Sequence, residues 1–347
     1  MAAERVLTQR DLNRAVLARQ GLLEPSTATM PQTLAAIGGL QAQYAPSMYV
    51  GLWSRMRDVR RDELTRALER RSVIQATLMR ITIHAVAKAD YWPFALATRE
   101  ARREAWIRAM RRAVDDATMR ALAARVREHL ARTDTISRKQ LDELVGKPHA
   151  IGVGLWIDLV RAPPAGTWER RRADLFASAE DWVGPPPRID TENAIAQLVR
   201  SYLAGFGPAS RADVASYTGL SRRALAPAYE RLTLRTFCSE SGDELLDVAR
   251  APLPDPDTPA PVRYLPTWDA TLLVHARRAL ILPERHRAKI FGVRNPHSLP
   301  TFLVDGAVAG TWKHRDGAIE LDPFEPLDPA TLRELREQGE RLAALHA

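Results

Sequence analysis

Cysteine is almost absent from this 347-residue sequence, and Cys238 has no second cysteine with which to pair. An intrachain disulfide is therefore excluded, as is a zinc site built on several cysteines. The sequence also lacks an apolar run of the roughly 18–20 residues that a membrane-spanning helix needs. Residues 1–13 are too charged and polar to resemble a signal peptide. We therefore expect a cytoplasmic protein that has no disulfide framework and makes no contact with membranes.

The signatures of common metal and cofactor sites are also missing. No His-Glu-x-x-His motif occurs, and the eight histidines are scattered along the chain. There is no phosphate-binding loop, and Gly152-x-Gly154 lacks the surrounding sequence of a dinucleotide-binding fold. The sequence therefore predicts neither a metal nor a cofactor.

Lysine is scarce as well, because it occupies only five of the 50 basic positions, against 42 acidic residues and a net charge of +8. Arginine carries a permanently charged planar fork that suits phosphate. This balance favours a polyanionic partner, most simply nucleic acid. Arginine is densest in a helical region predicted over residues 92–132, where Arg111 and Arg112 are our candidate phosphate contacts. The alternative is a set of solvated, arginine-rich helices without such a partner.

One helix-start pattern recurs three times, beginning at Thr8, Ser137 and Ser210. In each copy the hydroxyl residue stands three positions before an Asp or Gln, and an apolar residue follows. This spacing is typical of a capping box, in which both side chains bind free N–H groups at a helix start. Further helical sequence and then β-type sequence follow each copy. The order of elements predicts three winged-helix units in tandem.

The first unit and the last part of the chain differ in their predicted elements. The first unit has helices predicted at 8–20, 31–40 and 63–70, then strands at 73–79 and 81–87. Near the C-terminus, Asp305-Gly306 and Asp316-Gly317 favour tight hairpin turns. They predict a β-meander over 301–304, 307–313 and 318–321, extended by strands at 262–265 and 272–275 and closed by a helix that starts at 328 or 331. The fold class is α+β, mainly α.

A short polar segment, Gln41-Ala42-Gln43, interrupts an apolar stretch of the first unit. Its alternation places both Gln side chains on one side and Ala42 on the other. Two neutral amides placed in this way can hold one water molecule between them, and a water held at a reactive centre serves catalysis. The alternative is a pair of solvated or helix-capping glutamines.

Two hairpins carry further candidates for nucleic-acid contact. Arg80 stands at the turn of the first hairpin and His84 on its second strand. Lys313 and Arg315 stand at the second Asp-Gly hairpin, beside Trp312, which suits a nucleic-acid groove. The alternatives are a half-buried strand histidine at His84 and a solvated turn with Trp312 in the core.

Taken in order along nearly the whole chain, several short motifs resemble the winged-helix DNA glycosylases of the AlkZ/YcaQ family. Any one of them is generic, but their order and spacing are specific. They are Gly39-Leu40-Gln41-Ala42-Gln43-Tyr44, Leu78-Met79-Arg80-Ile81-Thr82-Ile83-His84, Glu180-Asp181-Trp182, Phe206-Gly207-Pro208-Ala209, Leu265-Pro266-Thr267-Trp268-Asp269, Leu303-Val304-Asp305-Gly306 and Gly310-Thr311-Trp312.

The resemblance implies a fold of three winged-helix units in a C-shaped arrangement with a C-terminal β-rich element. We therefore expect a first unit with its basic helical region over 1–132, a second over 133–188 and a third over 189–260. The C-terminal meander and closing helix take residues 261–347. The resemblance also adds Trp268 to the candidate DNA contacts.

The family's catalytic element is a Gln-x-Gln or Gln-x-Asp motif, and Gln41-Ala42-Gln43 matches the first form. This resemblance implies a monofunctional DNA glycosylase with Gln41 and Gln43 as catalytic residues. Its expected substrate is double-stranded DNA carrying bulky or crosslinked N7-alkylated purines, in DNA repair or in self-resistance to a genotoxic natural product. We expect it to act as a monomer. The alternative function is a non-catalytic winged-helix regulator that binds DNA.

Overall fold

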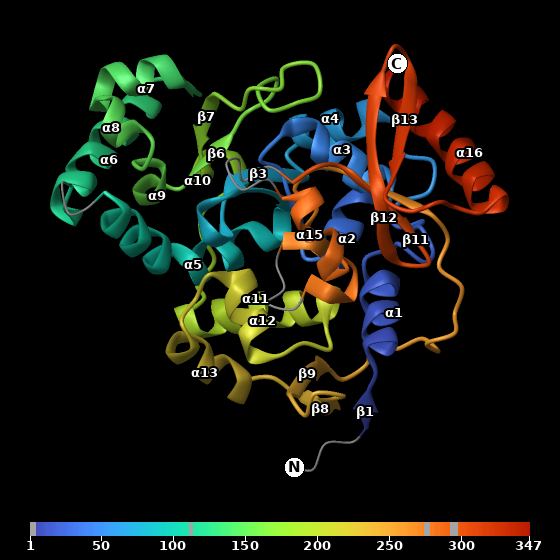
Figure 1. The fold of residues 1–347 in the computed structure, drawn as a ribbon. Coiled ribbons are helices and arrows are strands. Elements are labelled where there is room, and N and C mark those ends of the chain that lie inside the picture. The colour runs from blue at the N-terminus through green and yellow to red at the C-terminus, as the bar shows by residue number, and fades with distance from the viewer. Residues whose placement is uncertain (1–4, 111–113, 274–277, 292–297) are drawn as a thin grey trace.

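The computed structural model describes residues 5–110, 114–273, 278–291 and 298–347 (Figure 1). Helices surround three sheets of modest size, which confirms the predicted α+β class. Arg111 and Arg112, two of the candidate DNA contacts, lie outside the described residues.

The first winged-helix unit follows the order helix, strand, two helices and two strands. Strand β4 pairs antiparallel with both β2 and β3, which gives the order β2-β4-β3. The elements are α2 (Met30–Ala36), β2 (Leu40–Gln41), α3 (Ala45–Trp53), α4 (Arg61–Glu69), β3 (Val73–Thr77) and β4 (Ile83–Ala87), with the 3-10 turn η1 (Met79–Ile81) between the last two strands. Before them come β1 (Val6–Leu7) and α1 (Gln9–Arg19).

The second and third units repeat this order, except that three helices stand between the first and second strands of the second unit. In each, a short first strand pairs with the last strand of the unit: β5 with β7, and the single residue Ala209 with Leu246 of β9. α6 (Asp116–Leu130) shares one apolar cluster with α7 (Arg138–Val145) and α9 (Gly154–Ile157), so we count it with the second unit, although the sequence places this region in the first. The second unit continues with β5 (Ile136–Ser137), α7, α8 (Lys147–Ala150), α9, β6 (Leu159–Arg161) and β7 (Leu175–Ser178). After α10 (Ala179–Val183), the third holds α11 (Thr191–Phe206), α12 (Arg211–Thr218), α13 (Arg222–Glu230), β8 (Leu234–Ser239) and β9 (Glu244–Val248).

The first and second units share one sheet. Ala76 of β3 pairs with Val160 of β6, so the two hairpins join edge to edge in the order β2-β4-β3-β6-β7-β5. The second unit is therefore held to the first by backbone pairing, close to the strands that carry the Gln motif.

The third unit packs against the first through helices. α5 (Lys88–Ala109), which follows β4, lies against α11 within the largest apolar cluster. Phe94 of α5 and Tyr202 of α11 are fully buried there. At its other end the third unit receives β1, which pairs in parallel with β8.

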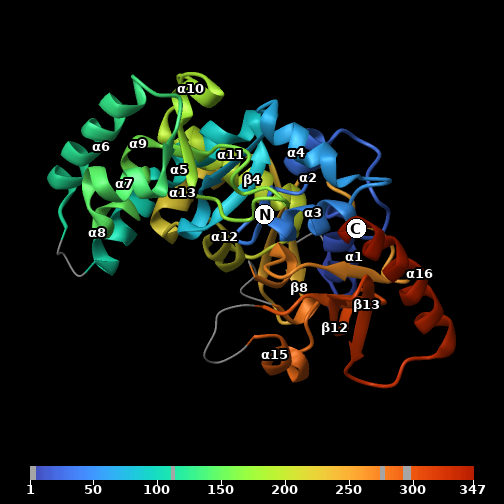
Figure 2. The ribbon, with the colours of Figure 1, turned by 90° about the horizontal axis from the view of Figure 1, so that it is seen from above.

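The C-terminal sheet confirms the predicted meander. Its strands are β10 (Arg263–Leu265), β11 (Thr301–Val304), β12 (Ala307–Arg315) and β13 (Ala318–Pro323), closed by α16 (Pro329–His346). Both Asp-Gly turns have positive φ at Asp and at Gly, as the tight hairpin requires. Figures 1 and 2 show this sheet and the second unit at opposite ends of the molecule.

The three predicted capping boxes are all present. The side chains of Thr8, Ser137 and Ser210 accept hydrogen bonds from the backbone three residues later and start α1, α7 and α12. The latter two helices occupy the same place in the second and third units. α1 instead precedes the first unit, so the first copy of the pattern does not mark an equivalent helix.

Two predicted elements are wrong. The helix at 31–40 ends at Ala36, because Gly38 and Gly39 both adopt positive φ, and Leu40–Gln41 form β2. A Cβ atom on Gly39 would lie 2.8 Å from Val86 Cγ1, so glycine permits the close approach of β2 to β4. The strand at 272–275 is replaced in its described part by α14 (Ala270–Leu273), whose first turn Asp269 caps by accepting from the N–H of Thr271 at 3.0 Å.

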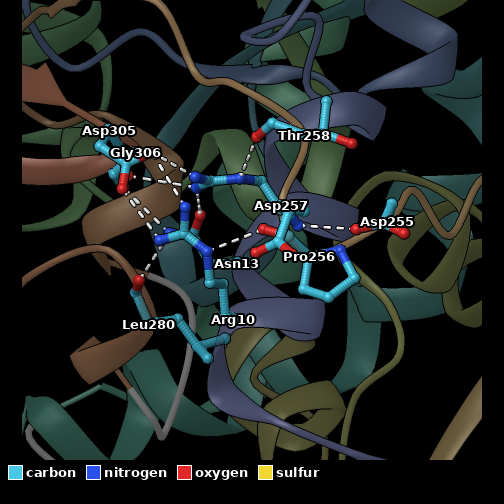
Figure 3. Close-up of polar contacts among 10 residues, drawn as sticks. Arg10, Asn13, Asp255, Pro256, Asp257, Thr258, Leu280, Asp305 and Gly306 are labelled. Carbon is cyan, nitrogen blue, oxygen red and sulfur yellow. Dashed lines mark hydrogen bonds and ion pairs between the residues drawn. The ribbon is translucent and has the colours of Figure 1, made fainter.

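The C-terminal sheet is anchored to α1 by polar side chains. Figure 3 shows Asn13 and the Asp305-Gly306 turn in contact. Asn13 Nδ2 donates to the carbonyl of Gly306 at 2.9 Å. The fully buried guanidinium of Arg14 pairs with the Asp305 carboxylate and donates to the carbonyl of Thr258 at 2.7 Å. The contact fixes the β11–β12 hairpin relative to the first helix.

The chain segment that connects β10 to β11 also holds two short helices, η2 (Arg278–Leu280) and α15 (Glu284–Ile290).

Replacing Arg14 by methionine is expected to lower the free energy of unfolding by about 3 kcal/mol, because the substitution leaves buried acceptors without a donor. Arg10 provides a matched control, since it also pairs with Asp305 but its side chain is 47% exposed. Water replaces most of that interaction, so Arg10→Met should cost much less. Urea denaturation followed by circular dichroism measures both variants, and equal losses would contradict this account of the anchor.

Candidate active site

The Gln motif lies at the junction between β2 and α3. Gln41 pairs with His84 across the β2–β4 ladder, and the N–H of Ala42 donates to the carbonyl of Ile83 at 2.7 Å. Ala42 is buried in the apolar core, so the motif follows the edge of β4 with its middle residue inward. Gln41 is 7% exposed and Gln43 is exposed.

Neither glutamine caps a helix. Helix α3 begins after Tyr44, and no side chain accepts a capping hydrogen bond at that residue. At the same junction of the second and third units, Ser137 and Ser210 cap the following helix. The first unit therefore has two amides where the other units have a cap, which rules out the capping alternative.

The oxygen of each motif amide is held by a donor from the first hairpin. Gln41 Oε1 accepts from Arg80 Nη2 at 3.3 Å, and Gln43 Oε1 accepts from the N–H of Ile83 at 3.2 Å. Guanidinium and backbone N–H groups only donate, so the orientation of both amides follows from their partners. Among the described residues neither NH₂ group has a hydrogen-bond partner, and neither nitrogen is buried away from solvent. Both NH₂ groups are available to a ligand.

Arg80 is half-buried, and its side chain turns toward protein. The guanidinium donates to the carbonyl of Tyr217 in α12 and lies 5.6 Å from the centre of the Tyr217 ring. Burial lowers the pKa of Arg80, and the hydroxyls of Tyr217 and Tyr202 counteract that effect. The residue predicted to contact phosphate thus connects the first hairpin, the Gln motif and the third unit.

His84 is 3% exposed and holds a fixed tautomer. Its Nδ1 lies 3.0 Å from the carbonyl of Thr82, which only accepts, so Nδ1 carries the proton. Burial and then the charge of Arg80 lower the pKa of His84 to about 3. The imidazole is neutral near pH 7, and its placement matches the alternative of a buried strand histidine.

A cavity lies beside Gln43. It has a volume of about 210 Å³ and is lined by residues of the first hairpin, α5 and the second unit. Gln43 lies at its edge, and its walls are mainly apolar and aromatic. The other wall residues that matter here are Ile81, Ile83, Trp106, Arg161 and Phe176.

A groove of about 410 Å³ begins at Tyr44, the residue that follows Gln43. Arg171 donates to the Tyr44 hydroxyl at 3.0 Å, and Lys313 and Arg315 of β12 are exposed at the groove. Arg315 also pairs with Glu320 at 3.5 Å. Gln43 therefore lines the apolar cavity, and the next residue, Tyr44, lines the basic groove.

The two predicted tryptophans differ in their surroundings. Trp312 is 5% exposed and its indole N–H donates to the carbonyl of Leu265 at 3.0 Å, so it packs in the core while lining the groove from beneath. Trp268 is half-buried with φ of 64°, and its backbone N–H donates to Ser298 Oγ at 2.7 Å.

Sequence reasoning did not find Tyr44, Trp106, Arg161 or Arg171. The run Trp168-Glu169-Arg170-Arg171-Arg172 was a usable signal, because it combines an aromatic residue with clustered arginines. No local signal marked Trp106 and Arg161, since they come from separate segments that only the shared sheet and α5 bring together.

In the described ranges there is no group of three or more His, Cys, Asp or Glu side chains arranged to hold a metal ion. None of the described helices is both long enough and apolar enough to span a bilayer.

Comparison with known proteins identifies one family and one solved structure. A family model described as "DNA glycosylase AlkZ-like" matches residues 34–345. The solved structure of the Streptomyces sahachiroi DNA glycosylase AlkZ superposes with a TM-score of 0.80 at 17% identity, over 98% of this chain and 97% of that chain. At that identity the superposition shows a common fold. A search of curated proteins finds no match.

His84 is expected to make the protein less stable as the pH falls. Its pKa in the folded chain, about 3, lies below the ordinary value of 6.5, so the unfolded chain binds the proton first. The stabilisation is complete above about pH 6.5 and is lost on descent toward pH 3. His84→Asn retains a donor for the Thr82 carbonyl without titrating. Its Tm should therefore depend less on pH than the wild-type Tm between about pH 5 and pH 6.5; equal slopes would show that His84 is not the group involved.

Proposed function

Because the chain belongs to the AlkZ-like DNA glycosylases, enzymes of DNA repair, we propose that Gln41 and Gln43 are its catalytic pair and that its substrates are bulky N7-alkylated purines. The observation that carries the proposal is the orientation of the two amides. Each has its oxygen held by the first hairpin and its NH₂ group available, and both residues lie within the range 34–345 that the family model matches.

The chemistry of an N7-alkylated purine suits two neutral amides. Such a base is already cationic, and departure of the base removes that charge, so strong acid assistance is unnecessary. The transition state resembles an oxocarbenium ion at the sugar, as in other glycoside cleavage. The remaining requirement is a water held near the anomeric carbon, which amides provide by position rather than by basicity.

A single water satisfies both amides. It accepts from one NH₂ group, donates to the second lone pair of the other amide oxygen, and keeps one lone pair for attack on the anomeric carbon. The bond from that carbon to the purine nitrogen breaks, and its electrons neutralise the base. The water's second proton passes to solvent or to a DNA phosphate oxygen, which leaves an abasic site.

We propose a monofunctional reaction without a lyase step. The described residues that line the cavity at Gln43 include no lysine that could form a Schiff base with the sugar. The apolar walls of the cavity and the open basic groove beyond Tyr44 favour a lesion that is bulky rather than small.

For DNA contact we propose Lys313 and Arg315, because both are exposed along the basic groove. Arg80, His84 and Trp312 face protein groups instead. Contacts by Trp268, Arg111 and Arg112 stay predictions. We also propose that the enzyme acts as a cytoplasmic monomer. Its proposed substrates include crosslinked DNA, and its proposed biological role includes self-resistance to a genotoxic natural product.

The experiment that tests this proposal measures base release from a duplex that carries a bulky N7-alkylguanine, and from the crosslinked form of the same duplex. Gln41→Ala with Gln43→Ala should lower the single-turnover rate by roughly a hundredfold or more, because the water loses its position. The DNA dissociation constant should stay near that of the wild type. Gln9→Ala is the matched control, since Gln9 is exposed at the start of α1.

Wild-type binding without base release from any N7 adduct would contradict the proposal. That result would favour the alternative of a non-catalytic winged-helix regulator for this chain. Equal rates for the double variant and the wild type would remove the catalytic assignment of the pair while leaving glycosylase activity intact.

A further inference from the structure

The side chain of Arg80 joins three parts of the molecule. It extends from the η1 turn, donates to Gln41 Oε1 at 3.3 Å and donates to the carbonyl of Tyr217 in α12. The guanidinium also lies above the Tyr217 ring, with 5.6 Å to the ring centre. Tyr217 in turn donates from its hydroxyl to the carbonyl of Gly38 at 2.6 Å, three residues before Gln41. The third unit therefore holds both Arg80 and the segment that leads into the motif.

The backbone at this position is strained. Arg80 has φ of 55° and Ile81 has φ of 59°, and both values lie in the left-handed region that β-branched residues in particular avoid. Such a conformation persists only where the surroundings determine it. Here Gly219, at the end of α12, lies against the turn, and a Cβ atom on Gly219 would approach Arg80 Cγ to 3.3 Å. The turn directs the arginine inward rather than into solvent.

A cation bound to an amide oxygen changes what the amide can do. The charge draws electron density away from the nitrogen, so the N–H groups become stronger donors. The cation also occupies one lone pair of the oxygen and repels a second donor, so the oxygen becomes a weaker acceptor. Gln43 differs, because among the described residues its oxygen accepts only from the neutral N–H of Ile83. The two amides of the motif are therefore chemically unequal.

Resting on the proposed function, we propose that Arg80 is a positioning residue for base release. It holds Gln41 with its oxygen inward, so that Gln41 donates to the attacking water and Gln43 accepts from it. Arg80 acts through Gln41 and does not touch the reacting atoms.

This role differs from the phosphate contact that sequence alone suggests. Loss of a phosphate contact weakens DNA binding and reduces the slope of log K against log salt by about 0.9. Loss of a positioning residue lowers the rate and leaves affinity and salt slope unchanged. The two roles therefore give separable results.

The test uses Arg80→Gly in the full chain, because glycine adopts positive φ freely and the turn keeps its backbone conformation. The matched control is Arg71→Gly at the other end of the same hairpin. Arg71 also has positive φ, 60°, donates to the carbonyl of Asp181 at 3.3 Å and lies over the Trp182 ring at 4.0 Å. It makes the same kinds of contact without touching the motif.

We expect Arg80→Gly to lower the single-turnover rate of base release by about tenfold or more, with DNA affinity and salt slope unchanged. Added methylguanidinium should restore part of the rate by occupying the vacated position. Arg71→Gly should release base at the wild-type rate. A reduced salt slope with an unchanged saturating rate would overturn the proposal in favour of a phosphate contact. Equal rate losses in the two variants would also overturn it, because they would indicate a structural effect that is not specific to Gln41.

A second measurement is independent of activity. With ¹⁵N-glutamine labelling, the Gln41 amide signals are identified by their loss in Gln41→Glu. They should shift in Arg80→Gly and stay in place in Arg71→Gly. Absence of a shift would overturn the positioning role even if both variants were impaired. If the wild type releases no base, the proposed function fails, and these signals still decide whether Arg80 orients Gln41.

Discussion

The contact between the Arg80 guanidinium and the Gln41 amide is the interaction on which the site depends. It exists because a left-handed turn directs the arginine inward, where Tyr217 and Gly219 of the third unit hold it. The same turn presents the N–H of Ile83 to Gln43. One short hairpin thus orients both amides, and a neighbouring unit fixes the hairpin. The packing of the third unit on the first is therefore part of what orients the two amides.

Much of the arginine in this chain serves the fold. Arg19 pairs with Asp247 at 2.7 Å and Arg55 with Asp269 at 2.9 Å, and all four side chains are buried. Arg14 adds the anchor of the C-terminal sheet. These pairs connect α1 and the residues after α3 to distant parts of the sequence. Loss of one partner of a buried pair would leave the other charge uncompensated. The excess of arginine therefore indicates a DNA partner less directly than composition alone suggests.

Local patterns predicted the elements that local chemistry controls. Hydroxyl caps at Thr8, Ser137 and Ser210 and the Asp-Gly turns gave correct starts and hairpins, because each depends on neighbouring residues. Local patterns could not predict which distant segments pair with one another. Strand β2 is two residues long and exists because Gly39 admits it beside β4. The inward direction of Arg80 depends on Tyr217, which is 137 positions away, so no local pattern reports it.

The central claim is that the two glutamines play unequal parts, with Gln41 as donor and Gln43 as acceptor. Comparing the single-turnover rates of Gln41→Glu and Gln43→Glu on an N7-alkylguanine duplex tests it most directly. Glutamate keeps the shape and the oxygen that binds Arg80 or Ile83, but it removes the NH₂ group. The account predicts that Gln41→Glu loses base release while Gln43→Glu retains it. Retention of activity in Gln41→Glu together with its loss in Gln43→Glu would contradict the account.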